Sequence, residues 1–232
     1  MAAAAGKPIT DEFGDFAFSP ENEAKAKTIV ARYPEGKQQS AVMPLLDLAQ
    51  RQIGEATGTQ GHLPVPVIEY VAAYLDMPYM RAYEVATFYT MYNLGQVGKF
   101  HVQLCGTTPC WLRGSDDVMR ACQDRGMAHG KTTDDGLFTL TEVECLGACA
   151  NAPMVQVNDD FYEDLTYEST LALLDALASG VTPKIGPQID RMNSAPEGGA
   201  TTLQTPIDDL IAEQKAARPS LEDREPETAD AE

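Results

Sequence analysis

Basic side chains are scarce in this sequence of 232 residues, with 17 lysine and arginine residues against 35 aspartate and glutamate residues. The formal net charge is −18 at pH 7, which argues against the basic face of a nucleic-acid binder and against docking on anionic lipid. No run approaches the roughly 18 apolar residues of a membrane helix. The alanines at 2–5 are too few for a signal peptide, and acidic residues follow them. We therefore expect a chain that is not exported and binds neither nucleic acid nor lipid directly.

Familiar nucleotide and redox motifs are also missing. No G-x-G-x-x-G follows a predicted strand, and the glycine that a P-loop ending at Gly130 would need is replaced by Arg125. No C-x-x-C redox pair and no Ser-His-Asp pattern with useful context is present. These absences predict that the chain itself binds no nucleotide, and they make a thiol–disulfide enzyme a weak alternative.

Helical signals fill residues 19–92. Ser19 is a good N-cap, and Pro20 suits the first helical position. Further helices are expected over 39–56, 65–75 and from Pro78 to about Tyr92, on apolar residues at helical spacing. The sequence predicts a helical bundle over 19–92, preceded by a flexible arm over 1–18.

The pattern changes over residues 93–186. Alternating residues predict strands at 100–104, 137–143 and 154–157, after which Asp159 and Asp160 turn the chain back through residues 161–162. Ser115 and Thr166 are expected to cap two helices. The resulting order of strand, helix, two strands and helix is typical of a small α/β layer with helices against one sheet.

The last segment, residues 187–232, carries five of the 15 prolines, 11 acidic and four basic residues. Few large apolar residues are present, so we expect an acidic, proline-rich tail that is disordered when free. It serves either as a solvated tail or as a partner-binding arm whose anchor would be Ile207, Leu210 and Ile211.

Four of the five cysteines form two pairs, Cys105-x4-Cys110 and Cys145-x3-Cys149. Each pair is expected in a loop just after a predicted strand, so both pairs are expected at one end of the sheet. Small, uncharged residues between the paired cysteines let backbone N–H groups approach sulfur, which favours an iron–sulfur cluster over zinc or simple burial. The extra negative charge of such a cluster would need Arg113 or loop amides nearby.

The remaining candidate ligands are expected to have other roles. Cys122 falls within the predicted helix after Ser115 and is interpreted as a core residue. The histidines, His62, His101 and His129, are scattered, and four cysteines already suffice for a cluster, so ordinary surface or core roles are favoured.

Four separated stretches resemble the small [2Fe–2S] subunit of NADH:quinone oxidoreductase, respiratory complex I. They occur in the family's order and are SAVMPLL at 40–46, VATFYTMY at 85–92, CGTTPC at 105–110 and CLGACANAP at 145–153. The resemblance covers about 19–186. It implies an α+β chain in which an N-terminal helical bundle precedes a thioredoxin-like [2Fe–2S] ferredoxin domain.

The resemblance also implies the site and its partners. Cys105, Cys110, Cys145 and Cys149 would ligate one [2Fe–2S] cluster near the FMN of a flavoprotein subunit that binds NADH. The chain would then be an electron carrier beside that subunit and the large multi-cluster Fe–S subunit. The helical bundle is implied to pack on the flavoprotein, and the residues that could serve that interface or the bundle core are Tyr83, Phe88, Tyr89, Met91 and Tyr92.

Two other interpretations stay open. Diaphorase modules of NAD-linked hydrogenases and formate dehydrogenases use similar subunits with the same ligands. A zinc-stapled binding module without a redox role is the alternative from a different class. The expected location is the bacterial cytoplasm, on the cytoplasmic side of the inner membrane, or the matrix side in a mitochondrion.

Overall fold

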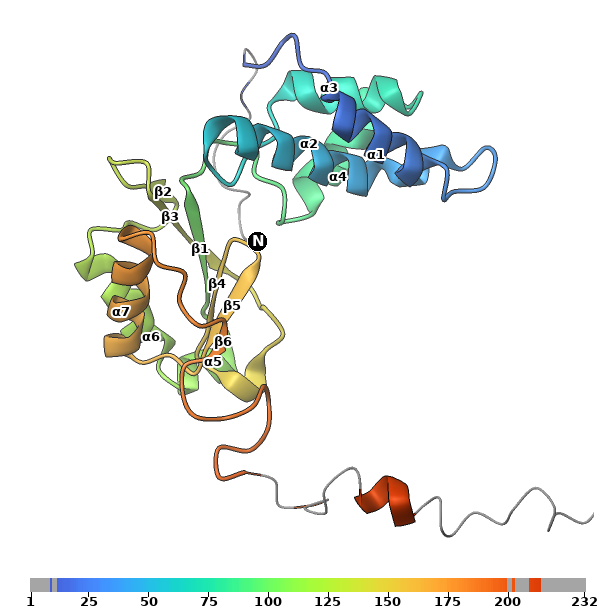
Figure 1. Cartoon of the computed structure of the whole chain (residues 1–232). Helices are drawn as coiled ribbons and strands as arrows, with labels where there is room; N and C mark the ends of the chain where they lie inside the picture. The colour runs from blue at the N-terminus through green and yellow to red at the C-terminus, as the bar shows by residue number, and fades with distance from the viewer. Residues whose placement is uncertain (1–8, 10–11, 200–201, 203–208, 214–232) are drawn as a thin grey trace, which may run out of the picture. The chain divides into compact units, whose positions relative to one another are not determined.

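The structure, a computed structural model, describes residues 9, 12–199, 202 and 209–213. It divides into two compact units, one up to Ile189 and one from Asp190 onward. The first unit contains all the labelled helices and strands (Figure 1). In the second unit, residues 209–213 are helical and Ile211 is 44% exposed, whereas the predicted anchor residue Ile207 lies outside the described residues.

The helical part begins where the sequence predicts. The Ser19 side chain accepts a hydrogen bond from the backbone N–H of Asn22 at 3.2 Å, which satisfies one of the unpaired donors at the helix start. The elements are α1 (Pro20–Val30), the 3-10 helix η1 (Gln38–Ala41), α2 (Val42–Thr57), α3 (Val65–Tyr74) and α4 (Tyr79–Phe88). Their apolar faces form one core, whose largest fully buried side chains include Leu45, Leu46, Ile53, Ile68 and Tyr92.

Helix α4 is shorter than the sequence pattern predicts. It ends at Phe88, because Tyr89 adopts an extended conformation with ψ of 121°. Tyr92 is nevertheless fully buried, and its hydroxyl donates a hydrogen bond to the Met43 carbonyl at 2.9 Å. An apolar residue after the end of the helix thus continues the buried pattern, and this continuation explains the longer prediction.

The segment before α1 packs on the helices, which the predicted flexible arm over 1–18 did not anticipate. Phe18 is only 7% exposed, and Phe13 and Phe16 pack against the same core. Phe18 meets Tyr70 and Tyr74 edge to face, with ring centroids 5.3 and 5.7 Å apart. Three aromatic side chains in a segment that is neither helix nor strand carry this packing, so no periodic pattern revealed it.

The second part of the first unit is a mixed sheet with strand order β2-β3-β1-β4-β5-β6. The strands are β1 (Phe100–Cys105), β2 (Lys131–Thr132), β3 (Phe138–Val143), β4 (Val155–Val157), β5 (Asp160–Glu163) and β6 (Gly186–Pro187). Strand β1 pairs with β3 in parallel and with β4 antiparallel. The helices are α5 (Thr108–Leu112), α6 (Ser115–Asp124) and α7 (Tyr167–Ala178), with η2 (Cys149–Asn151) as a 3-10 turn.

Helices α6 and α7 share one core with the sheet, as the predicted single layer of helices requires (Figure 1). Val118 and Cys122 of α6 join Leu173 and Leu174 of α7 in this core. The predicted strand, helix, two strands and helix are present as β1, α6, β3, β4 and α7, and β5 is a further strand between β4 and α7. Helix α5 and strands β2 and β6 are too short to have a periodic pattern. Ser115 is the first residue of α6 rather than its cap, since Gly114, with φ of 102°, holds the cap position.

Strand β6 crosses the boundary predicted between ferredoxin domain and tail at residue 187. It pairs with β5 in parallel, and the Gln188 backbone N–H donates to the Glu163 carbonyl at 2.9 Å. The contacts of the first unit therefore continue to Ile189.

We predict that a chain ending at Ile189 keeps its fold and any bound cluster, because the first unit holds the whole sheet. A chain ending at Ile185 loses β6, and its free energy of unfolding should fall by about 1–3 kcal/mol through lost backbone hydrogen bonds. Urea unfolding of the two truncated chains beside the full chain measures both values. A chain ending at Ile189 that is less stable than the chain ending at Ile185 would contradict this boundary.

Candidate functional site

Both cysteine pairs lie at one edge of the sheet. Cys105 is the last residue of β1 and is in register with Val143, the last residue of β3. Because the two strands are parallel, Cys145 follows two residues beyond the same edge. Cys149 opens η2, which leads into the start of β4, and β4 is antiparallel to β1. The expected convergence at one end of the sheet is therefore present in the backbone.

The four thiols differ in their burial. Cys105 and Cys110 are each 2% exposed, and they form a small apolar cluster with Ala152 and Met154. Cys145 and Cys149 are exposed, and none of these cysteines forms a disulfide. One pair is thus anchored in the protein and the other is open to solvent.

A short helix carries Cys110, which the sequence placed in a loop. Helix α5 starts directly after Thr107, and Pro109 suits its early helical position. Gly106 joins this helix to β1, and a side chain at that position would meet the Glu142 carboxylate. Arg113 follows α5 as its C-cap residue and is exposed.

Hydroxyl and backbone groups surround the sulfur atoms. The Thr107 hydroxyl oxygen lies 3.3 Å from Cys105 Sγ, and the Gly147 backbone N–H donates to Cys145 Sγ at 3.4 Å. Burial alone would raise the pKa of the Cys105 thiol, but hydrogen bonds from Thr107, from the Leu146 backbone and from Cys110 together hold this pKa below its ordinary value. The loops therefore stabilise a thiolate at Cys105.

Cys110 shows the opposite tendency. Burial, reinforced by the neighbouring Cys105, raises the pKa of the Cys110 thiol to about 12. The charge of Cys149 also contributes to this rise, so Cys149 lies near Cys110. The pKa values of the two buried thiols are thus shifted in opposite directions.

The residues present fit a cluster with thiolate ligands. Within the described part of the chain, no three histidine, cysteine, aspartate or glutamate side chains are grouped closely enough to hold a metal ion. The donors nevertheless have the right chemistry, since four thiols outside any disulfide occupy one edge and small residues separate the members of each pair. Gly147, with φ of 76°, turns its backbone N–H toward sulfur in a conformation that favours glycine.

Cys122 lies elsewhere, as its helical position predicts. It is fully buried in the core between α6 and the sheet, and burial raises the pKa of its thiol to about 12. A buried, protonated thiol of this kind behaves as a small apolar side chain.

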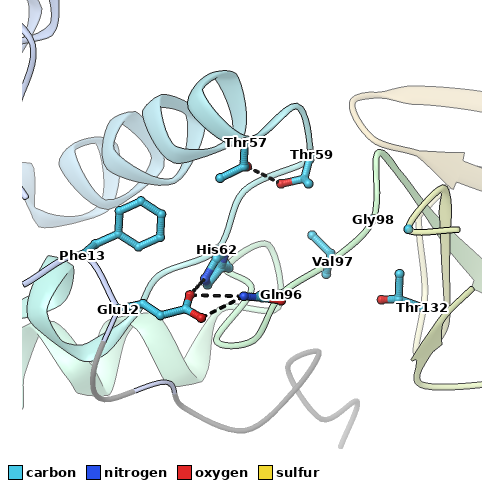
Figure 2. A pocket seen from close by; sticks show the side chains of 10 residues that line it. Glu12, Phe13, Thr57, Thr59, His62, Gln96, Val97, Gly98 and Thr132 are labelled. Carbon is cyan, nitrogen blue, oxygen red and sulfur yellow. Dashed lines mark hydrogen bonds and ion pairs between the residues drawn. The ribbon is translucent and has the colours of Figure 1, made fainter. Parts of the chain in front are cut away.

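The histidines have structural surroundings. His62 is 3% exposed, its Nε2 atom lies 3.3 Å from Glu12 Oε2, and Gln96 donates to the same carboxylate (Figure 2). These side chains line a cavity of about 430 Å³, and their contacts tie residue 12 to the helical part. His101 Nε2 lies 2.8 Å from Thr141 Oγ1, and burial lowers the pKa of His101 to about 4. His129 is exposed.

No described helix has both the length and the apolar character that crossing a bilayer requires.

Comparison with known proteins gives consistent results. The family model "Thioredoxin-like [2Fe-2S] ferredoxin" matches residues 26–178. An NADH-quinone oxidoreductase subunit of Rickettsia bellii is 58% identical over 164 residues, which cover 70% of this chain and 95% of the relative. The mitochondrial NADH dehydrogenase [ubiquinone] flavoprotein 2 of Dictyostelium discoideum is 48% identical over 199 residues, which cover 85% of this chain and 78% of the relative.

Among solved structures, an NAD+-reducing [NiFe]-hydrogenase in the air-oxidized state matches with a TM-score of 0.48 and 14% identity. The match covers 58% of this chain and 23% of that chain. The family model matches well over half of the chain, and the Rickettsia relative aligns over nearly its whole length. Two cysteine pairs at one sheet edge agree with this match. The chain therefore belongs to the thioredoxin-like [2Fe-2S] ferredoxin family.

Proposed function

We propose that the chain is an electron-transfer subunit of NADH:quinone oxidoreductase that holds one [2Fe–2S] cluster near the FMN of a flavoprotein subunit. The observation that carries this proposal is the meeting of two cysteine pairs at one sheet edge, in a chain 58% identical to an NADH-quinone oxidoreductase subunit of a Rickettsia species. When bound, the cluster accepts and releases one electron at a time. The protein supplies the ligands and the groups around them.

We assign Cys105, Cys110, Cys145 and Cys149 as the ligands. The buried pair would hold the inner part of the cluster in the apolar surroundings of Ala152 and Met154. The exposed pair would place the outer part near solvent or near a partner, where an electron can enter.

Serine at each cysteine separates the ligands from the core thiol. We expect each of the four ligand variants to lose the native visible spectrum and to bind less iron, because a hydroxyl is a poorer ligand for iron than a thiolate. Cys122→Ser should keep the full iron content, with at most a modest loss of stability from a buried hydroxyl. If Cys122→Ser loses the cluster while Cys149→Ser keeps its native spectrum, the assignment is wrong.

Hydride chemistry is left to the partner subunit. The sequence contains no dinucleotide motif, and hydride transfer needs a nicotinamide or flavin cofactor. The cluster-loaded chain alone should therefore show no NADH–ferricyanide activity above that of a heat-denatured control. Activity should appear once the flavoprotein subunit is added. Activity from the pure single chain would contradict this division of labour.

An apolar patch on and after α4 fits the proposed flavoprotein contact. We name it the α4 patch, and it consists of Met80, Phe88, Tyr89 and Met91, which are 58%, 77%, 38% and 50% exposed. Exposed aromatic and methionine side chains are enriched in protein interfaces. Tyr92, by contrast, is fully buried and Tyr83 packs on the core, so neither belongs to this surface.

Replacing Phe88 by glutamate should reduce copurification with the flavoprotein subunit at least tenfold, since a charge would be buried in the interface. Val181→Glu, at a side chain 58% exposed after α7, is the matched control and should copurify normally. Pull-down with the cluster-loaded chain measures both. Equal recovery of the two variants would remove the α4 patch from the interface.

Partner and location follow from the same proposal. The chain would contact the flavoprotein and the large multi-cluster Fe–S subunit, on the cytoplasmic side of the inner membrane or its matrix equivalent. An equivalent role in the diaphorase module of a hydrogenase or formate dehydrogenase would use the same ligands. The identity of the proteins that copurify distinguishes these assemblies.

A further inference from the structure

The Thr107 side chain lies between the two cysteines of the buried pair in sequence and contacts one of them in space. Its hydroxyl oxygen is 3.3 Å from Cys105 Sγ, within the range of a hydrogen bond to sulfur. Thr107 is half-buried, whereas the following Thr108 is exposed. The two adjacent threonines therefore offer a matched comparison at one site.

The Thr107 hydroxyl is available to sulfur because it does not cap the helix. Thr107 holds the N-cap position of α5, but among the described contacts its side chain makes no capping hydrogen bond. Its carbonyl accepts a hydrogen bond from the Trp111 backbone N–H at 2.9 Å, which fixes the residue at the start of the helix. The backbone thus orients the side chain, and the hydroxyl proton remains free to point at Cys105.

We propose that Thr107 tunes the cluster by donating a hydrogen bond from its hydroxyl to the sulfur of Cys105, and so raises the reduction potential. This inference rests on the proposed role of Cys105 as a ligand. A thiolate bound to iron has no proton, so it accepts this hydrogen bond and the threonine hydroxyl donates it.

The direction of the effect follows from charge. Reduction adds one electron and makes the cluster and its thiolates more negative. A donor aimed at ligand sulfur stabilises the reduced form more than the oxidised form, which raises the potential. The net charge of −18 favours the oxidised form, so a nearby hydrogen-bond donor offsets part of that field.

Thr107→Val removes the donor and keeps the side-chain shape. The extended backbone at Thr107, with φ of −75° and ψ of 168°, accepts a β-branched residue without strain. We expect the equilibrium constant for one-electron reduction to fall several-fold, up to about tenfold, and a tenfold fall corresponds to about 59 mV. Thr107→Ser, which keeps the hydroxyl, and Thr108→Val should both titrate close to the unchanged chain.

Redox titration of the cluster-loaded full chain, followed by visible absorption and by the EPR signal of the reduced state, measures these potentials. Should Thr107→Val fail to hold its cluster, Thr107→Ala beside Thr107→Ser provides the same comparison. A Thr107→Val potential equal to that of Thr108→Val would overturn the inference.

Failure of the ligand assignment would be visible separately. If Cys105→Ser retains the unchanged EPR spectrum and iron content, Cys105 is not a ligand and the underlying proposal fails. If Cys105→Ser loses the cluster while Thr107→Val does not change the potential, only the role of Thr107 is wrong.

Discussion

The parallel pairing of β1 with β3 is the constraint on which the site depends. Residues 100–105 and 138–143 are in register, so both strands end at the same edge. Both cysteine pairs therefore lie at this edge, although 34 residues separate Cys110 from Cys145 in the sequence. Helix α6 makes the crossover that parallel strands require, and its buried face, with Val118 and Cys122, holds this crossover on the sheet. Loss of that packing would separate the two cysteine pairs even if all four cysteines were unchanged.

The environment of the two pairs explains how one edge can serve electron transfer. Cys105 and Cys110 are enclosed by apolar residues, which keep water away from half of the site. Cys145 and Cys149 are exposed, which leaves the other half accessible to a redox partner. A hydroxyl group at Thr107 and the backbone N–H of Gly147 supply polar contacts to sulfur in this strongly acidic chain.

Much of this architecture could be predicted from the sequence because its elements are long and periodic. The helices starting at Pro20 and Val65 and the strand at Phe100 begin where the sequence pattern indicates, and the strand at Phe138 begins one residue later than predicted. What the sequence did not reveal depends on tertiary packing: the aromatic contacts of Phe13, Phe16 and Phe18, the burial of Tyr92 beyond α4, and strand β6. The cysteine spacing predicted the site, but the contact of Thr107 with Cys105 depends on how α5 begins, and five residues are too few to show a period.

EPR of the dithionite-reduced full chain, together with assays of iron and acid-labile sulfide, shows directly whether the chain holds a [2Fe–2S] cluster. We expect a red-brown protein with about two iron and two sulfide ions per chain and the signal of a reduced [2Fe–2S] cluster. A colourless protein that contains zinc, holds no sulfide and gives no signal after reduction would contradict it.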